Sequence, residues 1–267
     1  MGQSAVVGLD EFRRHMAGLE GSYAIIGGTA CDILLSDADL PFRATHDLDT
    51  VLVADARLPQ TAKAIWELIH DGGYRCGWGG EQRTCFYRFT DPTQPGYPFM
   101  IELFSKEPNF LTGTTGIEVG PLHVDDDVSS LSAILLNEEY YRVMLGGIKT
   151  VDGLSVLAET HLIPFKAKAY LDLSERRQQG EQIDSKKIKK HKRDVLRLAQ
   201  LLGGNERVTL PQSVQNDMTA FLEDCRGDHT ANLKQIGIHG ASLDDLLNTM
   251  NDVYGIQPHG KTGHPYP

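Results

Sequence analysis

Two short segments near the N-terminus combine residue types that can act on phosphates. The first is Gly27-Gly28-Thr29, where the lack of glycine side chains lets the backbone approach a ligand and the following helix start directs N–H groups at an anion. The second is Asp47-x-Asp49 on a strand-like run, whose side chains project from one face. Two negatively charged carboxylates on neighbouring positions of one strand face repel each other unless a cation lies beside them. The pair therefore predicts metal-assisted chemistry on a polyphosphate.

A third acid, Glu102, lies in the apolar run Phe99–Phe104. A buried carboxylate without a partner costs several kcal/mol, so Glu102 needs a partner or a metal, unless it reaches solvent from a strand edge. Carboxylate and water oxygens are the ligands that Mg²⁺ prefers. We therefore expect Asp47 and Asp49 to hold magnesium, with Glu102 either completing the metal site or activating an acceptor.

These motifs resemble the signature of the nucleotidyltransferase superfamily, which has the DNA polymerase beta-like fold. Within it, Gly-Gly-Thr followed by Arg-x-Thr-x-Asp-Leu-Asp is most similar to the AbiEii-type toxins of abortive-infection and toxin–antitoxin systems. The resemblance implies magnesium-dependent transfer of a nucleoside monophosphate from an NTP to a hydroxyl acceptor. Gly27, Gly28 and Thr29 would hold the phosphates, although Thr29 can also cap its helix. The implied partners are an RNA acceptor such as tRNA and a cognate antitoxin.

The second half of the chain carries the rest of the resemblance. The AbiEii-type pattern has a lysine within a helix and, later, an aspartate in a Lys/Arg-Asp-x-x-x-Leu segment. By resemblance these correspond to Lys166 and Asp194, with Lys168 as the alternative lysine. Residues two apart on a helix do not share a face, so only one of the two lysines can steady a triphosphate in the cleft. Asp194 would position groups near that lysine.

A basic run, Lys186–Arg193, precedes Asp194. Most such runs are solvated helix faces. Lysines in a first helical turn oppose the helix dipole, however. The helical spacing also predicts one shared stripe for Lys187, Lys190, Asp194 and Arg197. Such a stripe could instead guide a nucleotide or an RNA backbone.

Composition limits the classes of protein to consider. The 267 residues are 40% hydrophobic and carry a net charge of −10, which is typical of a globular chain and unlike a general nucleic-acid binder. The four cysteines form no CxxC pair, so they indicate neither a zinc site nor a disulfide framework. The sequence has no long apolar run and no leader-like start, so we expect a cytoplasmic protein without membrane contact.

The periodicity predicts an α/β (α+β) fold, a nucleotidyltransferase-like mixed sheet with flanking helices, plus a C-terminal helical domain. The expected domains are a catalytic domain at 1–127, a helical domain at 128–256 and a disordered tail at 257–267. The expected strands are 23–26, 48–53, 84–89 and 99–104. The expected helices are 9–19, 29–35, 58–69, 131–141, 154–173, 184–202, 211–225 and 243–253.

The sequence motifs are also compatible with two other functions. The first is the same chemistry on a small-molecule acceptor, as in antibiotic nucleotidyltransferases. The second is a catalytically silent module that keeps the fold and binds a nucleotide or a partner.

Overall fold

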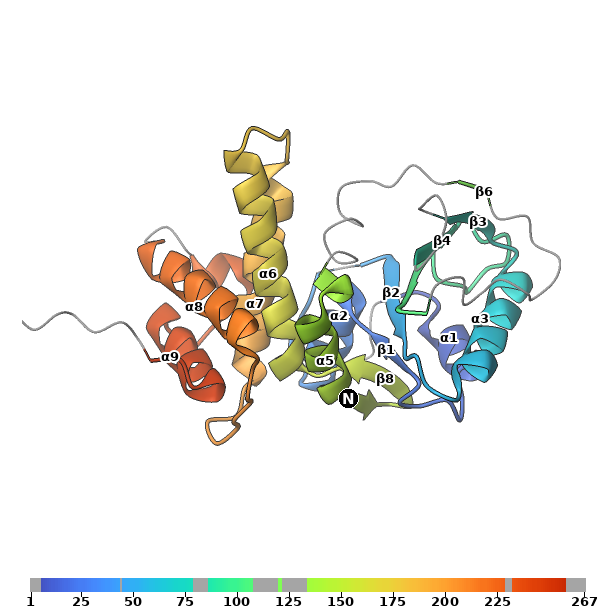
Figure 1. Cartoon of the computed structure of the whole chain (residues 1–267), viewed down its shortest axis with the longest axis horizontal. Helices are drawn as coiled ribbons and strands as arrows, with labels where there is room; N and C mark the ends of the chain where they lie inside the picture. The colour runs from blue at the N-terminus through green and yellow to red at the C-terminus, as the bar shows by residue number, and fades with distance from the viewer. Residues whose placement is uncertain are drawn as a thin grey trace, which may run out of the picture.

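A mixed sheet with helices on it organises the chain (Figure 1). The computed structural model describes residues 6–43, 45–78, 86–107, 120–121, 134–228 and 232–257. Among them, the sheet has eight strands in the order β6-β3-β4-β5-β2-β1-β8-β7. The strands are β1 (Tyr23–Ile25), β2 (Asp47–Leu52), β3 (Arg75–Trp78), β4 (Phe86–Thr90), β5 (Met100–Ser105), β6 (Gly120–Pro121), β7 (Ile148–Val151) and β8 (Leu154–Leu157). The predicted mixed α/β fold is confirmed.

The two central strands carry the predicted acids. Strand β2 runs parallel to β5 and antiparallel to β1, and β4 is antiparallel to β5 on its other side. The register places Asp49 opposite Glu102. Because residues directly opposite on paired strands project from the same face, this register brings the two side chains together. Leu48, between Asp47 and Asp49, is fully buried, as the alternation requires.

The helices cover the sheet and continue beyond it. They are α1 (Leu9–His15), α2 (Gly27–Asp37), α3 (Leu58–Gly72), α5 (Glu138–Gly146), α6 (Glu159–Gln178), α7 (Ser185–Leu198), α8 (Gln212–Gly227) and α9 (Leu243–Tyr254), with 3-10 turns η1 (Ala199–Leu201) and η2 (Leu233–Ile236). In Figure 1, α6 to α9 gather beside α2, while α3 lies at the other end of the sheet. Across the described residues, no helix has both the length and the apolar character to cross a bilayer.

One apolar core joins these parts. It includes Ile25 and Val51 of the sheet, Phe165 of α6 and Phe221 of α8, all of which are essentially inaccessible to solvent. Helix α6 packs against both α7 and α8, and α2 contacts β2, α6 and α7. The helical part is therefore continuous with the core of the sheet. The predicted boundary between residues 127 and 128 lies outside the described residues, so the division into domains stays a prediction.

The prediction of one helix over 154–173 is wrong in its first residues. Leu154–Leu157 forms β8, which pairs in parallel with β1, and α6 begins only at Glu159. Strand β8 is joined to β7 by Asp152 and Gly153, both with positive φ (46° and 72°). This Asp-Gly pair is the usual signal for a two-residue hairpin turn. The apolar run after it does not by itself distinguish a buried strand from a helix.

The other predicted elements differ mainly at their ends. The first helix stops at His15 rather than Leu19, and α2 begins at Gly27, two residues earlier than expected. Strand β3 and strand β7 were not expected. Asp184 caps α7 by accepting a hydrogen bond from the Lys186 N–H at 2.8 Å, as predicted. Residues 84–85, 131–133 and 258–267 of the predicted strand, helix and tail lie outside the described residues.

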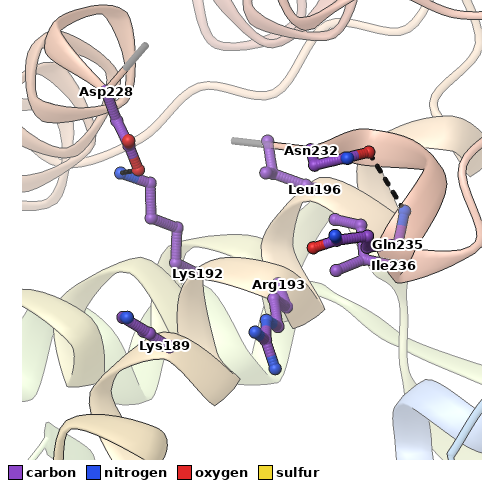
Figure 2. Close-up of a pocket in the computed structure, with 8 residues that line it drawn as sticks. All are labelled: Lys189, Lys192, Arg193, Leu196, Asp228, Asn232, Gln235 and Ile236. Atoms are coloured by element: carbon purple, nitrogen blue, oxygen red, sulfur yellow. Dashed lines mark hydrogen bonds and ion pairs between the residues drawn. The ribbon is translucent and has the colours of Figure 1, made fainter. Parts of the chain in front are cut away.

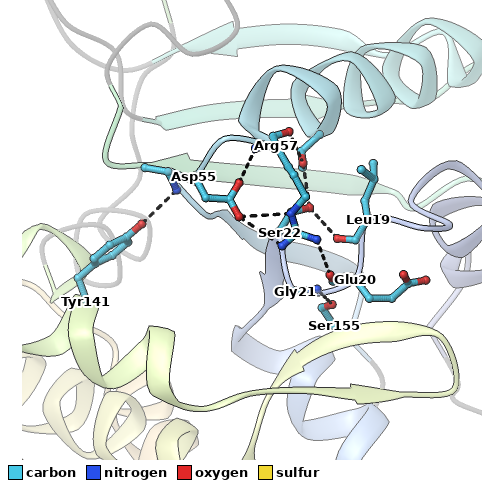
Figure 3. A network of polar contacts seen from close by, with 10 residues as sticks. Leu19, Glu20, Gly21, Ser22, Asp55, Arg57, Tyr141 and Ser155 are labelled. Atoms are coloured by element: carbon cyan, nitrogen blue, oxygen red, sulfur yellow. Dashed lines mark hydrogen bonds and ion pairs between the residues drawn. The ribbon is translucent and has the colours of Figure 1, made fainter.

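A polar network fixes the sheet at the end remote from Asp49 (Figure 3). The Gly21 N–H donates to Oγ of the buried Ser155 at 2.8 Å, which ties the turn before β1 to β8. Arg57 donates to Asp55 at 3.2 Å and to the Glu20 carbonyl at 3.0 Å. These partners satisfy one another, so the network has a structural role.

A proline inside α6 ties this helix to α9. Pro164 has no N–H to give to the carbonyl of Thr160, four residues earlier. The hydroxyl of the buried Tyr254 donates to that carbonyl instead, at 2.8 Å. The contact therefore anchors α9 to α6 at Thr160, six residues before Lys166.

We predict that Tyr254→Phe lowers the free energy of unfolding by about 1–3 kcal/mol, because it leaves a buried carbonyl without a donor. Denaturant titration measures this change. Tyr170→Phe is the matched control, since its hydroxyl bonds Asp224 at an exposed site and its loss should cost under about 1 kcal/mol. Equal losses in the two variants would contradict this account.

Candidate active site

The glycine turn and the acid pair meet in the structure. Gly27 begins α2 with φ of +70°, and a Cβ atom placed on it would lie 1.7 Å from Oδ2 of Asp49. The missing side chain therefore makes room for a carboxylate of the chain itself. The Ile26 N–H also donates to the Asp49 carbonyl at 2.9 Å. Asp49 thus faces the turn that was predicted to bind phosphate.

The rest of the motif closes around the same helix start. A Cβ on Gly28 would lie 2.9 Å from Oγ1 of Thr45 and 3.4 Å from Nη2 of Arg43. The hydroxyl of the fully buried Thr29 donates to the Asp47 carbonyl at 2.6 Å. The predicted capping role of Thr29 is wrong, since no side chain caps α2 and Ile26 is the N-cap residue. The first-turn N–H groups of α2 therefore remain without a side-chain cap.

Glu102 has a cationic partner. Both Nε and Nη2 of Arg88, opposite it on β4, lie 2.7 Å from its Oε1. The side chains of Arg88 and Glu102 are only 11% and 13% exposed, so the alternative of a solvent-exposed edge residue is wrong. Because the carboxylate is already paired, its charge does not require a metal ion.

The acids interact strongly with one another. Asp49 keeps partial solvent exposure, yet burial raises its pKa well above the ordinary value, and the adjacent Glu102 raises it further through charge and hydrogen bonding. Lys166 lowers the pKa of Asp49, while the charge of Asp47 adds to the rise. Ionising Asp49 while Glu102 is charged therefore costs free energy, and a cation beside the two carboxylates would reduce that cost.

A second cluster, of positive charge, lies next to these acids. Asp194 of α7 is 1% exposed, and its Oδ2 lies 3.2 Å from both Nζ of Lys166 and Nη2 of Arg43. Two cations around one buried carboxylate leave an excess of positive charge. Nε of Arg43 is buried with no hydrogen-bond partner among the described residues. We call Arg43, Lys166 and Lys190, together with Asp194, the cation cluster.

The opposite charges of Lys166 and Asp194 stabilise each other. Burial acts to lower the pKa of Lys166, but Cys31 and Asp194 outweigh it and the pKa is raised. Burial also raises the pKa of the Cys31 thiol to about 12, so at neutral pH Asp194 is the charged partner. For Asp194, burial raises the pKa, and Lys166 and Arg43 more than compensate and lower it. The ion pair is therefore charged at neutral pH.

Two residues of α7 complete the surroundings. Desolvation, followed by the charges of Arg43 and Lys166, lowers the pKa of Lys190, while Asp194 and Asp49 oppose this. Lys190 thus lies within electrostatic reach of both clusters. Burial, followed by the charge of Lys166, lowers the pKa of His191 to about 3, so His191 is neutral at physiological pH.

Lys168 lies elsewhere. Its Nζ is 3.1 Å from Asp172 and 3.4 Å from Asp217, and the Tyr140 hydroxyl donates to the same Asp217 at 2.9 Å. The structure therefore brings Lys166, and not Lys168, to Asp194. Lys168 joins α6 to α8.

The carboxylates suit a magnesium ion that is bound partly by a ligand. Within the part of the chain that the structure describes, no three carboxylate, imidazole or thiol groups converge to hold a metal alone. Mg²⁺ commonly uses one or two carboxylates and takes its other oxygens from water and substrate phosphates. Asp49, whose charge is opposed by burial and by Glu102, and the neighbouring Asp47 on the same strand fit that use. The three-acid set with Glu102 stays a prediction.

Sequence reasoning gave no site role to Arg88 and none of its own to Arg43, and it gave Lys190 a role only as part of the basic stripe. Arg43 stood in the motif, and its position two residues before Thr45 was the available signal. Lys190 lies one helical turn before Asp194, which indicated a shared face. Arg88 had no local signal, because its pairing with Glu102 depends on the register of β4 and β5.

Comparison with known proteins gives a distant structural likeness. A crystal structure of an antigenic nucleotidyltransferase-like protein from Paracoccidioides brasiliensis is similar to the chain, with a TM-score of 0.41 and 16% identity over 90% of this chain and 94% of that one. No protein-family model and no curated protein matches the chain. A likeness of this size assigns no activity.

We predict that Asp194→Asn lowers the free energy of unfolding by about 3–5 kcal/mol, because Lys166 and Arg43 lose a buried counter-charge. Denaturant titration at neutral pH measures the loss. The control, Asp224→Asn, removes an ion-pair partner of Lys192 that is 45% exposed and should cost under about 1 kcal/mol. An Asp194→Asn variant as stable as the control would show that the cluster does not need this carboxylate.

Proposed function

We propose that the chain is a magnesium-dependent nucleotidyltransferase that moves a nucleoside monophosphate from an NTP to a hydroxyl group. One observation carries the proposal: the start of α2, which no side chain caps, has the Asp49 carboxylate against Gly27 and Arg43 of the cation cluster near Gly28. Metal-ligand oxygens and phosphate-binding cations are the two parts that phosphoryl transfer requires. A pair of strand carboxylates without a catalytic role would not need phosphate-binding cations nearby.

The chain's own groups have distinct roles in this reaction. The N–H groups at the start of α2 would hold phosphate oxygens at the positive end of the helix dipole. Arg43 and Lys166 would neutralise the triphosphate, with Asp194 fixing their positions. Asp47 and Asp49 would hold magnesium, which when bound polarises the reacting phosphoryl group.

The bond changes follow from the substrates. The acceptor hydroxyl loses its proton, its oxygen bonds to the α-phosphorus, and the bond from that phosphorus to the bridging oxygen of the β-phosphate breaks. Pyrophosphate leaves with charge that Lys166 and Arg43 would stabilise. Glu102, held by Arg88 beside Asp49, would orient the acceptor hydroxyl.

The acceptor and the biological role of the protein are proposed from the sequence motifs. The AbiEii-type resemblance supports an RNA such as tRNA as acceptor, a toxin role and a cognate antitoxin. A small-molecule acceptor would use the same site. The identity of the acceptor is therefore an outcome of the transfer assay.

We predict that the protein, given α-labelled NTPs and Mg²⁺, transfers label to total RNA, and that Asp49→Asn reduces transfer at least about 100-fold because it weakens metal binding. The exposed Asp244→Asn on α9 is the control and should transfer normally. Label on small hydroxyl compounds alone would replace RNA as the acceptor. NTP binding without any transfer would identify a silent module, and normal transfer by Asp49→Asn would refute the site.

We also predict that Gly27→Ala lowers transfer at least about 100-fold, because the new methyl group displaces Asp49 and small misplacements of reacting groups are costly. The control is Gly18→Ala, where φ is +80° but no atom lies within 4 Å of the added Cβ. It carries similar backbone strain without touching the site. Comparable losses of transfer in both variants would show that strain alone, and not the contact with Asp49, is responsible.

A further inference from the structure

Helix α7 borders a second cavity, away from the candidate active site. This α7 pocket, of about 230 Å³, lies between α7 and η2 (Figure 2). Lys189 and Arg193 face it one helical turn apart. Lys190 and Asp194, which belong to the cation cluster, are the next residues along the chain and so lie about 100° around the helix. The pocket and the candidate active site are therefore on different faces of α7.

The pocket carries unneutralised positive charge. Its third cation, Lys192, is paired with Asp224 and Asp228 at 3.0 Å each. Among the described residues, Lys189 and Arg193 have no ion-pair partner. Both residues are exposed to solvent, so their positive charges are accessible to an anion that enters the cavity. They indicate an anionic ligand.

The opposite wall is held in place by hydrogen bonds. Oδ1 of Asn232 accepts a hydrogen bond from the Gln235 N–H at 3.3 Å, which leaves its side-chain NH₂ group free to donate (Figure 2). Nε of Arg197 donates to the Ile236 carbonyl at 2.7 Å and ties η2 to α7. A guanidinium fork, an ammonium and amide donors around a fixed cavity match the oxygens of a phosphate group.

Charge and volume favour a particular phosphate. A phosphate monoester carries about −1.5 to −2 charges at pH 7, which matches two free cations, whereas a phosphodiester carries one. The pocket is smaller than the ~300–1,000 Å³ of most small-molecule sites, so it suits a phosphate with a sugar-sized group. We propose that the α7 pocket binds the terminal phosphate of a small phosphorylated molecule, independently of the catalytic cleft.

The test is an NMR titration of the full chain with ribose 5-phosphate, without NTP or metal, that follows the side-chain amides of Asn232 and Gln235. We expect saturable shifts, and a Kd at least about 10-fold weaker for Lys189→Gln/Arg193→Gln, which loses both charge-assisted contacts. Lys186→Gln, an exposed site on the same helix that does not line the pocket, is the matched control and should bind as the wild type does.

Three results would overturn the proposal. They are the absence of saturable shifts at Asn232 and Gln235, an unchanged Kd in the double variant, or equal shifts with ribose that lacks the phosphate. Tighter binding of a short single-stranded RNA without a terminal phosphate would replace the monoester with a backbone phosphate. The Asp49→Asn variant should retain pocket binding, so failure of the proposed transferase activity and failure of this site are distinguishable.

Discussion

The burial of one carboxylate organises the centre of this protein. Asp194 is almost inaccessible to solvent and is held by Lys166 of α6 and by Arg43 of the segment between α2 and β2. A buried charge is tolerated only when its partners are fixed around it, so three separate parts of the chain must meet at one point. That meeting places two cations next to the start of α2. The helical part of the chain thereby supplies charge to a site whose other half lies on the sheet.

The sheet contributes negative charge to the candidate active site. Asp49 lies against Gly27, and Glu102, brought level with it by the register of β2 and β5, is neutralised by Arg88. Because Arg43 lies near Gly28, charges of both signs meet at one helix start. Asp47 and Asp49 would hold the magnesium of a magnesium–nucleotide complex, and Arg43 and Lys166 would neutralise its phosphate oxygens. The correspondence is the physical basis of the proposed activity.

Helix α7 takes part in two environments because its basic residues are distributed around it. One face contributes Asp194 and Lys190 to the cation cluster, and the adjacent face turns Lys189 and Arg193 to a separate cavity. Arg197 lies between them, since it bonds η2 and its guanidinium is 5.4 Å from the ring of Phe42, which also contacts Arg43. The basic run Lys186–Arg193, whose sequence is typical of a single solvated helix face, is thus split between two environments by the packing of α7.

The sequence by itself determined the local features. Alternating acids on a strand and the Asp184 cap follow from backbone preferences within a few residues, and both lie where the pattern predicted, whereas Gly27 and Gly28 begin the helix that they were expected to precede. Tertiary structure alone decided that Lys166 rather than Lys168 meets Asp194, that Arg88 pairs with Glu102, and that Leu154–Leu157 is a strand of the sheet. These outcomes depend on register and helix packing, in which residues distant in sequence supply the energy. The Asp152-Gly153 turn marks the hairpin locally, but it does not specify that β8 pairs with β1.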